Sequence, residues 1–239
     1  MITIVGTGHV FDLRTEIERI ISETKPDVIC VELDEERYKG LMLKKEGTKI
    51  KRSGSFLYNL LARFQERAAK IYNVNAGDEM LFALKTAQER GISIALIDMN
   101  AQMVFREMFK IMPFKEKIRL LLSSLTSLFV TRESIEKEIN KLQNDYRRFM
   151  EEIDKRFPTV KKILIDRRDS FMVTKLERLN QDHNSILAFV GDGHVPGIEK
   201  RLRLRNIEVR VIRLGEIIKD EANTARFSVV YDTNDGPVA

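Results

Sequence analysis

The sequence contains one cysteine, three histidines and no tryptophan among its 239 residues. The lone Cys30 excludes an internal disulfide and indicates a reducing compartment, so we expect a cytoplasmic protein. A disulfide-stapled miniature fold is also excluded, because a chain of this length buries a sizeable core without covalent help. Hydrophobic residues make up 43% and charged residues 32% of the chain, a balance typical of a globular protein.

Long apolar runs, a leader pattern and nucleic-acid motifs are missing as well. No uncharged stretch reaches the ~18 residues that a membrane-spanning helix needs, and Met1 leads directly into a strand pattern, so we expect no signal peptide. The net charge of +5 is mild, and no zinc-finger, RNA-recognition or basic-aromatic pattern points to nucleic acid as a partner. The apolar segment 118–130 predicts a buried helix, with peripheral membrane contact as the alternative.

Two of the three histidines occupy matching positions in a repeated motif. Residues 2–10 and 188–195 each consist of an apolar run followed by Gly-x-Gly-His-Val, which places His9 and His194 alike. Such a run predicts a buried strand that enters a turn, and ligands of parallel α/β sheets bind at the carboxyl ends of strands. We therefore expect both imidazoles at one sheet edge. The alternative is tight strand-to-helix packing in which histidine caps a helix. The motif is not the dinucleotide-binding fingerprint, because its third glycine is missing.

The rest of the pattern predicts an α/β fold with a mostly parallel central sheet flanked by helices. Continuous apolar runs are typical of buried parallel strands, and here they alternate with amphipathic stretches that predict helices. Strands are expected at the two motifs and at 28–31, 92–97, 207–212 and 227–231, and helices at 13–23, 56–72, 101–112, 160–179 and after residue 77.

Carboxylates follow several of the predicted strands. Glu32 and Asp34 come directly after the strand at 28–31, and Asp98 follows the strand at 92–97. Asp34 also reads as a helix cap, so Glu32 is the better candidate for the crevice. Glu79 stands in the first turn of a predicted helix, where the helix dipole alone favours a carboxylate. The basic segment 39–52 predicts a solvated loop, with an anion-binding role as the alternative.

Residues 113–182 predict a long helical hairpin inserted into an α/β core formed by 1–112 and 183–239. Its first arm carries a heptad seam, which indicates a helix pairing face. We expect the hairpin to project from the core or to pair with a second copy in a homodimer; the alternative is that it packs only on its own domain. The seam consists of Ile135, Ile139, Leu142, Tyr146, Phe149 and Ile153.

These residues in this order resemble the TraB family, which includes pheromone-shutdown proteins and is allied to the Tiki proteases. The resemblance covers most of the chain and rests on the paired Gly-x-x-His motifs with Glu32-Leu33-Asp34 between them. It extends to Gly77 with Glu79, Leu96-Ile97-Asp98, and Arg168-Asp169 with Met172. The family fold is an α/β core like that of the erythromycin-esterase and ChaN-like proteins. Its members usually continue into membrane helices, whereas we expect a soluble member that lacks them.

For the Tiki branch, the resemblance implies a metal-dependent protease acting on a peptide or protein substrate. Carried over, His9, Glu32 and His194 would bind the metal, and Glu79 and Arg168 would be catalytic. Substrate contacts would fall to Arg37, Asp98 and Asp169. Nitrogen and oxygen ligands suit manganese, cobalt or zinc about equally. The pheromone-shutdown branch implies instead a non-catalytic protein that binds a peptide or partner, with the helical hairpin as its working surface.

Two positions depart from the family pattern. Many members have an arginine after the aspartate of the third strand, where this chain has Met99. The family's Glu-Arg-Asp appears here as Arg167-Arg168-Asp169. Both departures affect groups that would contact the substrate, so the resemblance does not identify which peptide is bound.

Overall fold

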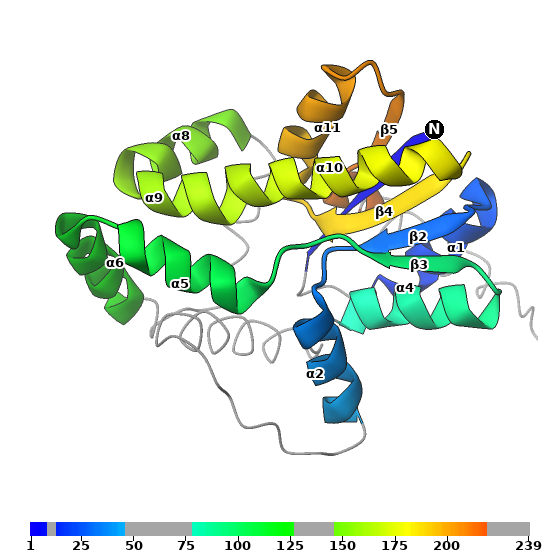
Figure 1. Cartoon of the computed structure of the whole chain (residues 1–239), viewed down its shortest axis with the longest axis horizontal. Coiled ribbons are helices and arrows are strands. Elements are labelled where there is room, and N and C mark those ends of the chain that lie inside the picture. The colour runs from blue at the N-terminus through cyan, green and yellow to red at the C-terminus, as the bar shows by residue number, and fades with distance from the viewer. Residues whose placement is uncertain (9–12, 46–77, 127–145, 219–239) are drawn as a thin grey trace, which may run out of the picture.

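Five parallel strands form the central sheet of this computed structural model, which describes residues 1–8, 13–45, 78–126 and 146–218. Their order across the sheet is β3-β2-β4-β1-β5, and every pairing is parallel (Figure 1). The predicted α/β fold with a parallel sheet is therefore confirmed. The strands are β1 (Ile2–Thr7), β2 (Val28–Val31), β3 (Ser93–Leu96), β4 (Ile186–Gly191) and β5 (Val209–Ile212).

The three inner strands are buried on both faces because their side chains are apolar at nearly every position. In β4, Leu187 and Phe189 face one hydrophobic cluster, while Ile186, Ala188 and Val190 face another. Successive side chains of a strand point to opposite faces, so an uninterrupted apolar run supplies two cores at once. Burial on both faces explains why apolar and polar residues do not alternate along these strands.

One expected strand differs in its burial. The run at 92–97 was predicted as a buried strand, but β3 lies at the sheet edge, and Ile94 is 37% exposed. Among the described residues β3 pairs only with β2, and no described strand lies on its outer side. Local hydrophobicity does not distinguish an edge strand from a central one.

In the part of the chain that the structure describes, two helices cover one face of the sheet. Helix α1 (Arg14–Thr24) contributes Ile17, Ile20 and Ile21 to the core, and α4 (Asp78–Glu89) contributes a matching apolar stripe. Lys25 ends α1 in the left-handed conformation at φ 44°. The short helix α2 (Glu35–Lys45) leaves the end of β2, and Asp34 caps it by accepting the backbone N–H groups of Glu36 and Arg37, each at 3.0 Å.

Helices α10 (Arg167–Asp182) and α11 (Val195–Arg203) cover the other face. Their buried residues, among them Met172, Leu176 and Ile198, pack against the strands. α10 continues α9 (Pro158–Val160) through a π-helical segment, Lys161–Asp166, so a helical stretch runs from 158 to 182, as expected for the second arm of the hairpin. This arm packs on the sheet through Met172, Val173 and Leu176, and the pairing of the hairpin with a second copy stays a prediction.

A group of helices extends beyond the sheet on the side of α9 (Figure 1). It contains α5 (Ala101–Ile111), α6 (Phe114–Thr126) and α8 (Tyr146–Arg156). Val104 and Met108 of α5 pack with Ile163 in a separate hydrophobic cluster. Within the described ranges no helix is long and apolar enough to cross a membrane.

Several predictions fall outside the described residues. They include the helix at 56–72, the strand at 227–231, the first half of the heptad seam and half of the basic segment 39–52. The division into a core and a hairpin insertion stays a prediction for the same reason.

Candidate functional site

Polar side chains leave the carboxyl ends of four of the five strands and meet at one sheet edge. Glu32 follows β2, Asp98 follows β3, Asp192 and His194 follow β4, and Arg213 follows β5. In parallel α/β sheets this edge is where ligands bind. His9, which follows β1 in the sequence, lies outside the described residues.

The turn after β4 is held by hydrogen bonds to the end of β1, to the end of β4 itself and to the residues that follow β5. The backbone N–H of Asp192 donates to the Thr7 carbonyl at 2.9 Å, and the N–H of His194 donates to the Gly191 carbonyl at 2.8 Å. The Asp192 carboxylate accepts two hydrogen bonds from Arg213, at 2.8 and 2.6 Å, and one from the Leu214 N–H at 3.0 Å. A fixed turn gives the His194 side chain a defined position.

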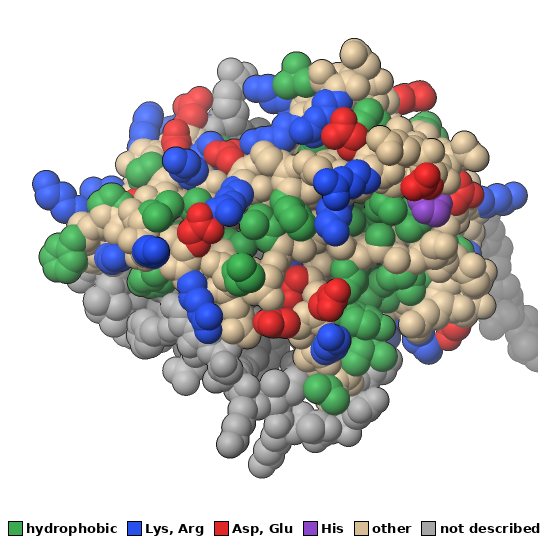
Figure 2. All heavy atoms as spheres, viewed as in Figure 1, with side chains coloured by type: hydrophobic (Ala, Val, Ile, Leu, Met, Phe, Trp, Pro, Cys, Tyr) green, Lys and Arg blue, Asp and Glu red, His purple; other side chains and the backbone are tan. Residues whose placement is uncertain are grey.

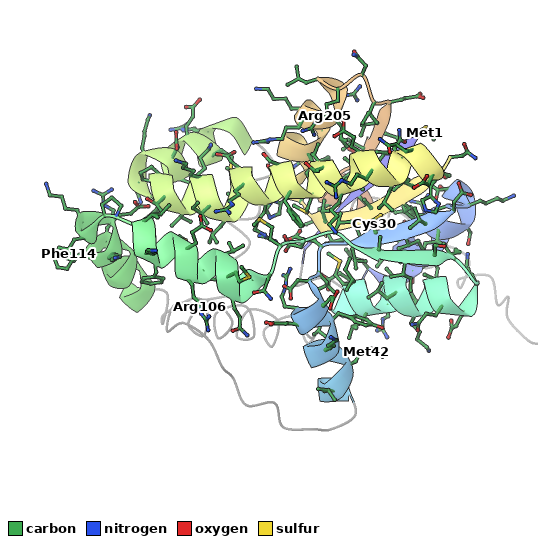
Figure 3. All side chains as sticks on the ribbon, in the orientation of Figure 1. Met1, Cys30, Met42, Arg106, Phe114 and Arg205 are labelled. Atoms are coloured by element: carbon green, nitrogen blue, oxygen red, sulfur yellow. The ribbon has the colours of Figure 1, made fainter. Side chains whose placement is uncertain are left out.

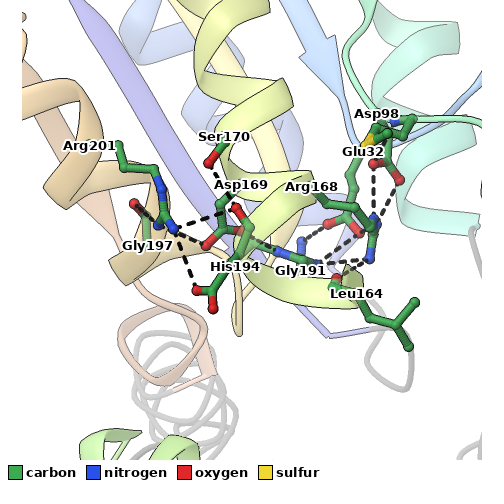
Figure 4. A network of polar contacts seen from close by, with 12 residues as sticks. Glu32, Asp98, Leu164, Arg168, Asp169, Ser170, Gly191, His194, Gly197 and Arg201 are labelled. Atoms are coloured by element: carbon green, nitrogen blue, oxygen red, sulfur yellow. Dashed lines mark hydrogen bonds and ion pairs between the residues drawn. The ribbon is translucent and has the colours of Figure 1, made fainter. Parts of the chain in front are cut away.

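The imidazole of His194 is nearly buried and is oriented from both ring nitrogens (Figure 4). Its Nδ1 lies 2.6 Å from Asp169 Oδ1, and its Nε2 lies 3.1 Å from Arg168 Nη1. A guanidinium only donates, so Nε2 accepts, and in a neutral ring Nδ1 then carries the proton and donates it to Asp169. In this tautomer the Nε2 lone pair is directed at Arg168 Nη1.

Asp169 is itself held from the far side. Arg201 Nη1 lies 3.3 Å from its Oδ2, and a Cβ on Gly197 would overlap that carboxylate, so the glycine makes room for it. Burial raises the pKa of Asp169, against the lowering influence of His194 and Arg201. A buried carboxylate behind a histidine is a common arrangement for orienting a metal-binding or proton-accepting imidazole.

Glu32 spans the gap between β2 and the turn after β4. Its Oε2 accepts the backbone N–H of Gly191 at 2.6 Å, and its Oε1 lies 3.5 Å from His194 Nε2. The same Oε1 also accepts a hydrogen bond from Arg168 Nη2. Glu32 is therefore a buried carboxylate beside the imidazole, not a solvated residue at a strand end.

Arg168 and Arg37 share the carboxylate of Asp98. Arg168 Nε donates to Oδ1 at 3.0 Å and Nη2 to Oδ2 at 2.6 Å, while Arg37 Nη2 donates to the same Oδ2. Arg37 Nε also donates to Asp34 Oδ2 at 2.6 Å. The charged segment 166–169 thus turns two of its members, Arg168 and Asp169, inward, although such a cluster on a helix is usually solvated.

The structure brings together most of the predicted site residues, namely Glu32, Arg37, Asp98, Arg168, Asp169 and His194. Glu79 is buried in the first turn of α4. It is not among the polar partners of Arg168 or His194 in the described part of the chain, and its catalytic role stays a prediction.

Three contributors were not predicted as site residues. Arg201 holds Asp169, Asp192 fixes the turn after β4, and Asp34 joins the network through Arg37 besides capping α2. Asp192 had a visible signal, since it is an acidic residue inside the glycine-histidine motif at a strand end. Arg201 had none, because its partner lies 32 positions away in the sequence.

The donor chemistry of His194 and Glu32 fits part of a metal site. Two ligands bound at 2.0–2.1 Å to one tetrahedral ion lie ~3.3 Å apart, close to the 3.5 Å between His194 Nε2 and Glu32 Oε1. The described residues contain no cluster of three or more histidine, cysteine or acidic groups arranged to hold a metal. A third protein ligand would have to come from elsewhere, and His9 is the residue that the sequence motif supplies.

Fold and site together define an α/β protein with a histidine, carboxylate and arginine cluster at the carboxyl edge of a parallel sheet. The chain belongs to the TraB/PrgY/gumN family, which it matches over residues 1–211. It is 33% identical, over 211 residues, to an uncharacterized protein of Methanocaldococcus jannaschii. That match covers 84% of this chain and 53% of the relative, so the chain spans about half the length of the archaeal protein.

Proposed function

We propose that this protein is a metal-dependent hydrolase that cleaves peptide bonds at the carboxyl edge of its sheet. The observation that carries the proposal is the pair formed by His194 Nε2 and Glu32 Oε1, 3.5 Å apart, with the imidazole oriented by Asp169 at 2.6 Å. Such a pair offers one neutral nitrogen and one carboxylate oxygen to a divalent ion, and manganese, cobalt and zinc accept this combination.

The chain's own residues have distinct tasks in this proposal. His194 and Glu32, with His9 as the third ligand, hold the ion, and Asp169 keeps the His194 proton on Nδ1. When bound, the ion would supply Lewis-acid polarisation of a peptide carbonyl. Glu79 is the proposed general base for the attacking water. Arg37 and Arg168 lie around the pair and are proposed to border the bound peptide. Asp98 and Asp169, predicted as substrate contacts, are buried and instead hold Arg168 and His194 in place.

The first test is metal content. The untagged full chain would be purified, reconstituted with manganese, cobalt or zinc, and measured by elemental analysis beside a His9→Ala/His194→Ala variant. We expect near-stoichiometric metal in the wild type and none in the variant. No metal in either protein after reconstitution would refute the proposal.

A second measurement tests the orienting role of Asp169. Replacing a carboxylate behind a metal-binding histidine typically weakens metal binding by about 10–100-fold, and we expect Asp169→Asn to do so. Asp166→Asn is the matched control, because Asp166 also pairs with Arg201, at 3.4 Å, but does not touch His194. Cleavage of a random peptide library, followed by mass spectrometry, should fall in parallel with metal occupancy.

A second candidate function, binding of a peptide or protein partner without catalysis, is favoured by exposed apolar side chains on α5 and α6. Phe114 is 76% exposed and Met103 67% exposed, with Ile111 and Ile118 also on the surface. Phe114 projects from the end of the helical group (Figure 3), and one face of the molecule shows apolar patches between charged side chains (Figure 2). Partner capture or self-association lost in Phe114→Ser/Ile118→Ser but kept in His194→Ala would support this function.

A further inference from the structure

Arg168 binds the two atoms that the proposed metal would need. Its Nη1 lies 3.1 Å from His194 Nε2, and its Nη2 donates to Glu32 Oε1 (Figure 4). The remaining bonds of the guanidinium go to Asp98, bidentately at 3.0 and 2.6 Å, and to the Leu164 carbonyl at 3.2 Å. The guanidinium is thus a fixed cation, attached on one side to Asp98 and on the other to the histidine–carboxylate pair.

A metal ion and this guanidinium cannot use the same lone pair. A neutral imidazole whose Nδ1 is protonated has one acceptor position, Nε2, and Arg168 Nη1 is directed at it. Glu32 Oε1 is similarly engaged. Metal binding at this pair therefore requires Arg168 to leave Nε2. Glu32 Oε1 has a second lone pair, but repulsion between the ion and the guanidinium opposes their sharing this oxygen.

We propose that Arg168 is an internal competitor of the metal: it bridges Glu32 and His194, and ion binding displaces it while Asp98 retains it. This inference rests on the proposed function. It goes beyond a substrate-contacting arginine, because it makes the affinity for the ion depend on a cation built into α10.

The surrounding charges restrict how Arg168 can leave Glu32 and His194. Burial alone lowers the pKa of Arg168, but the carboxylates of Glu32 and Asp98 outweigh burial and raise that pKa above its ordinary value. The guanidinium therefore stays charged, and it must leave by moving rather than by losing a proton. When it moves, the guanidinium can keep its bidentate hydrogen bonds to Asp98.

Arg37 provides a matched comparison within the same network. It also donates to Asp98, yet its other carboxylate partner is Asp34 rather than Glu32. Neutralising either arginine removes one positive charge near Asp98. Only the loss of Arg168 also frees the proposed ligand atoms, so the two variants separate direct competition from a general change of charge.

The experiment titrates the full chain, freed of metal by a chelator, with Co²⁺ by isothermal titration calorimetry near neutral pH. Arg168→Met should bind Co²⁺ at least about tenfold more tightly than the wild type, since tenfold corresponds to a single modest interaction. Arg37→Met should stay within about threefold. Arg168→Lys serves if Arg168→Met folds poorly: a lysine keeps the charge but lacks the planar fork, and an intermediate gain is expected. His194→Ala added to Arg168→Met should remove the gain.

The outcomes separate this inference from the proposed function. Equal Co²⁺ affinity of wild type, Arg168→Met and Arg168→Lys would overturn the competition while the metal site stands. An equal gain in Arg37→Met would also overturn it, because the effect would then be one of charge alone. If none of the proteins binds Co²⁺ at millimolar concentration, the metal-dependent function fails and the competition with it. Binding only when Arg168 is replaced would support the competition most directly.

Discussion

At the scale of single residues, the first and second glycine positions of the repeated motif differ in whether a side chain would fit. A Cβ on Gly6 would overlap the carboxylate of Asp192, which Arg213 and the Leu214 N–H hold in place. A Cβ on Gly193 would meet nothing within 4 Å. Gly6 therefore leaves no room for a side chain, whereas Gly193 does.

This difference predicts unequal costs of adding a methyl group. Gly6→Ala should lower the free energy of unfolding by about 1–3 kcal/mol, as overpacking of a close contact does, and should disturb the turn that positions His194. Gly193→Ala should stay within about 0.5 kcal/mol of wild type. Urea unfolding measures both values, and similar losses for the two variants would contradict the packing argument.

Cys30 predicts a pH effect on stability. It lies fully buried on β2, and burial raises the pKa of its thiol from an ordinary 9.0 to about 12 (Figure 3). Because the thiol ionises more readily in the unfolded chain than in the folded one, stability is unaffected by Cys30 below the unfolded pKa of 9.0. As the pH rises from 9 toward 12, the fold loses stability at about 1.4 kcal/mol per pH unit. Urea unfolding at several pH values should therefore show the wild type losing stability relative to Cys30→Ala in that window.

The control for Cys30 is thiol reactivity. Because the chain has only this cysteine, a thiol reagent should detect no thiol in the folded protein at pH 8 and one after denaturation. Rapid reaction of the folded protein would show that the side chain is accessible and would remove the basis for the pH prediction.

At the scale of elements, Asp34 connects three of them. It lies between β2 and α2 and caps α2 by accepting the N–H groups of Glu36 and Arg37. It also accepts the N–H of Ala101 at the start of α5, at 3.2 Å. Its Oδ2 also pairs with the Arg37 guanidinium. One carboxylate thus fixes the position of two helices relative to the sheet edge.

Asp34→Ala should therefore cost more than the loss of a cap alone. The cap contributes about 1 kcal/mol, and Arg37 also loses one of its two carboxylate partners while Asp98 remains, so we expect a loss of about 2–3 kcal/mol. Asp34→Asn should cost about half as much, because asparagine caps as well as aspartate but lacks the charge. Chemical denaturation of both variants tests this, and equal losses would show that the cap contributes little.

The elements themselves could largely be predicted from the sequence. Apolar runs located the five described strands, and Asp34 was correctly read as a cap. The edge position of β3 and the π-helical segment before Arg168 could not be predicted. Strand order depends on contacts between distant segments, and a π-helical turn has no local hydrophobic pattern that differs from an α-helix.

At the scale of the whole molecule, the site is a product of the strand order. β4 lies between β1 and β2, so the end of a strand late in the chain meets the ends of two early ones. The sequence predicted that strand ends would gather His194, Glu32 and Asp98, because parallel strands end at one edge. It could not predict that Arg168 bridges them, since α10 approaches from a separate layer.

The whole molecule should also report metal binding through its stability. An ion that binds only the folded chain adds about 2.7 kcal/mol to the free energy of unfolding at a hundredfold excess over its Kd. For a chain of this size that corresponds to roughly 5–10 °C in Tm. We expect Co²⁺ to raise the Tm of the wild type by this amount when measured by scanning calorimetry, and EDTA to reverse the shift.

His194→Ala should remove the metal-dependent shift, while Asp166→Asn, which leaves the His194 and Glu32 contacts in place, should retain it. A shift that persists in His194→Ala would place the ion elsewhere on the molecule. The stability of the sheet would depend on the ion because Glu32 and His194 follow two adjacent strands, β2 and β4. An ion bound at this pair would join the two strand ends directly.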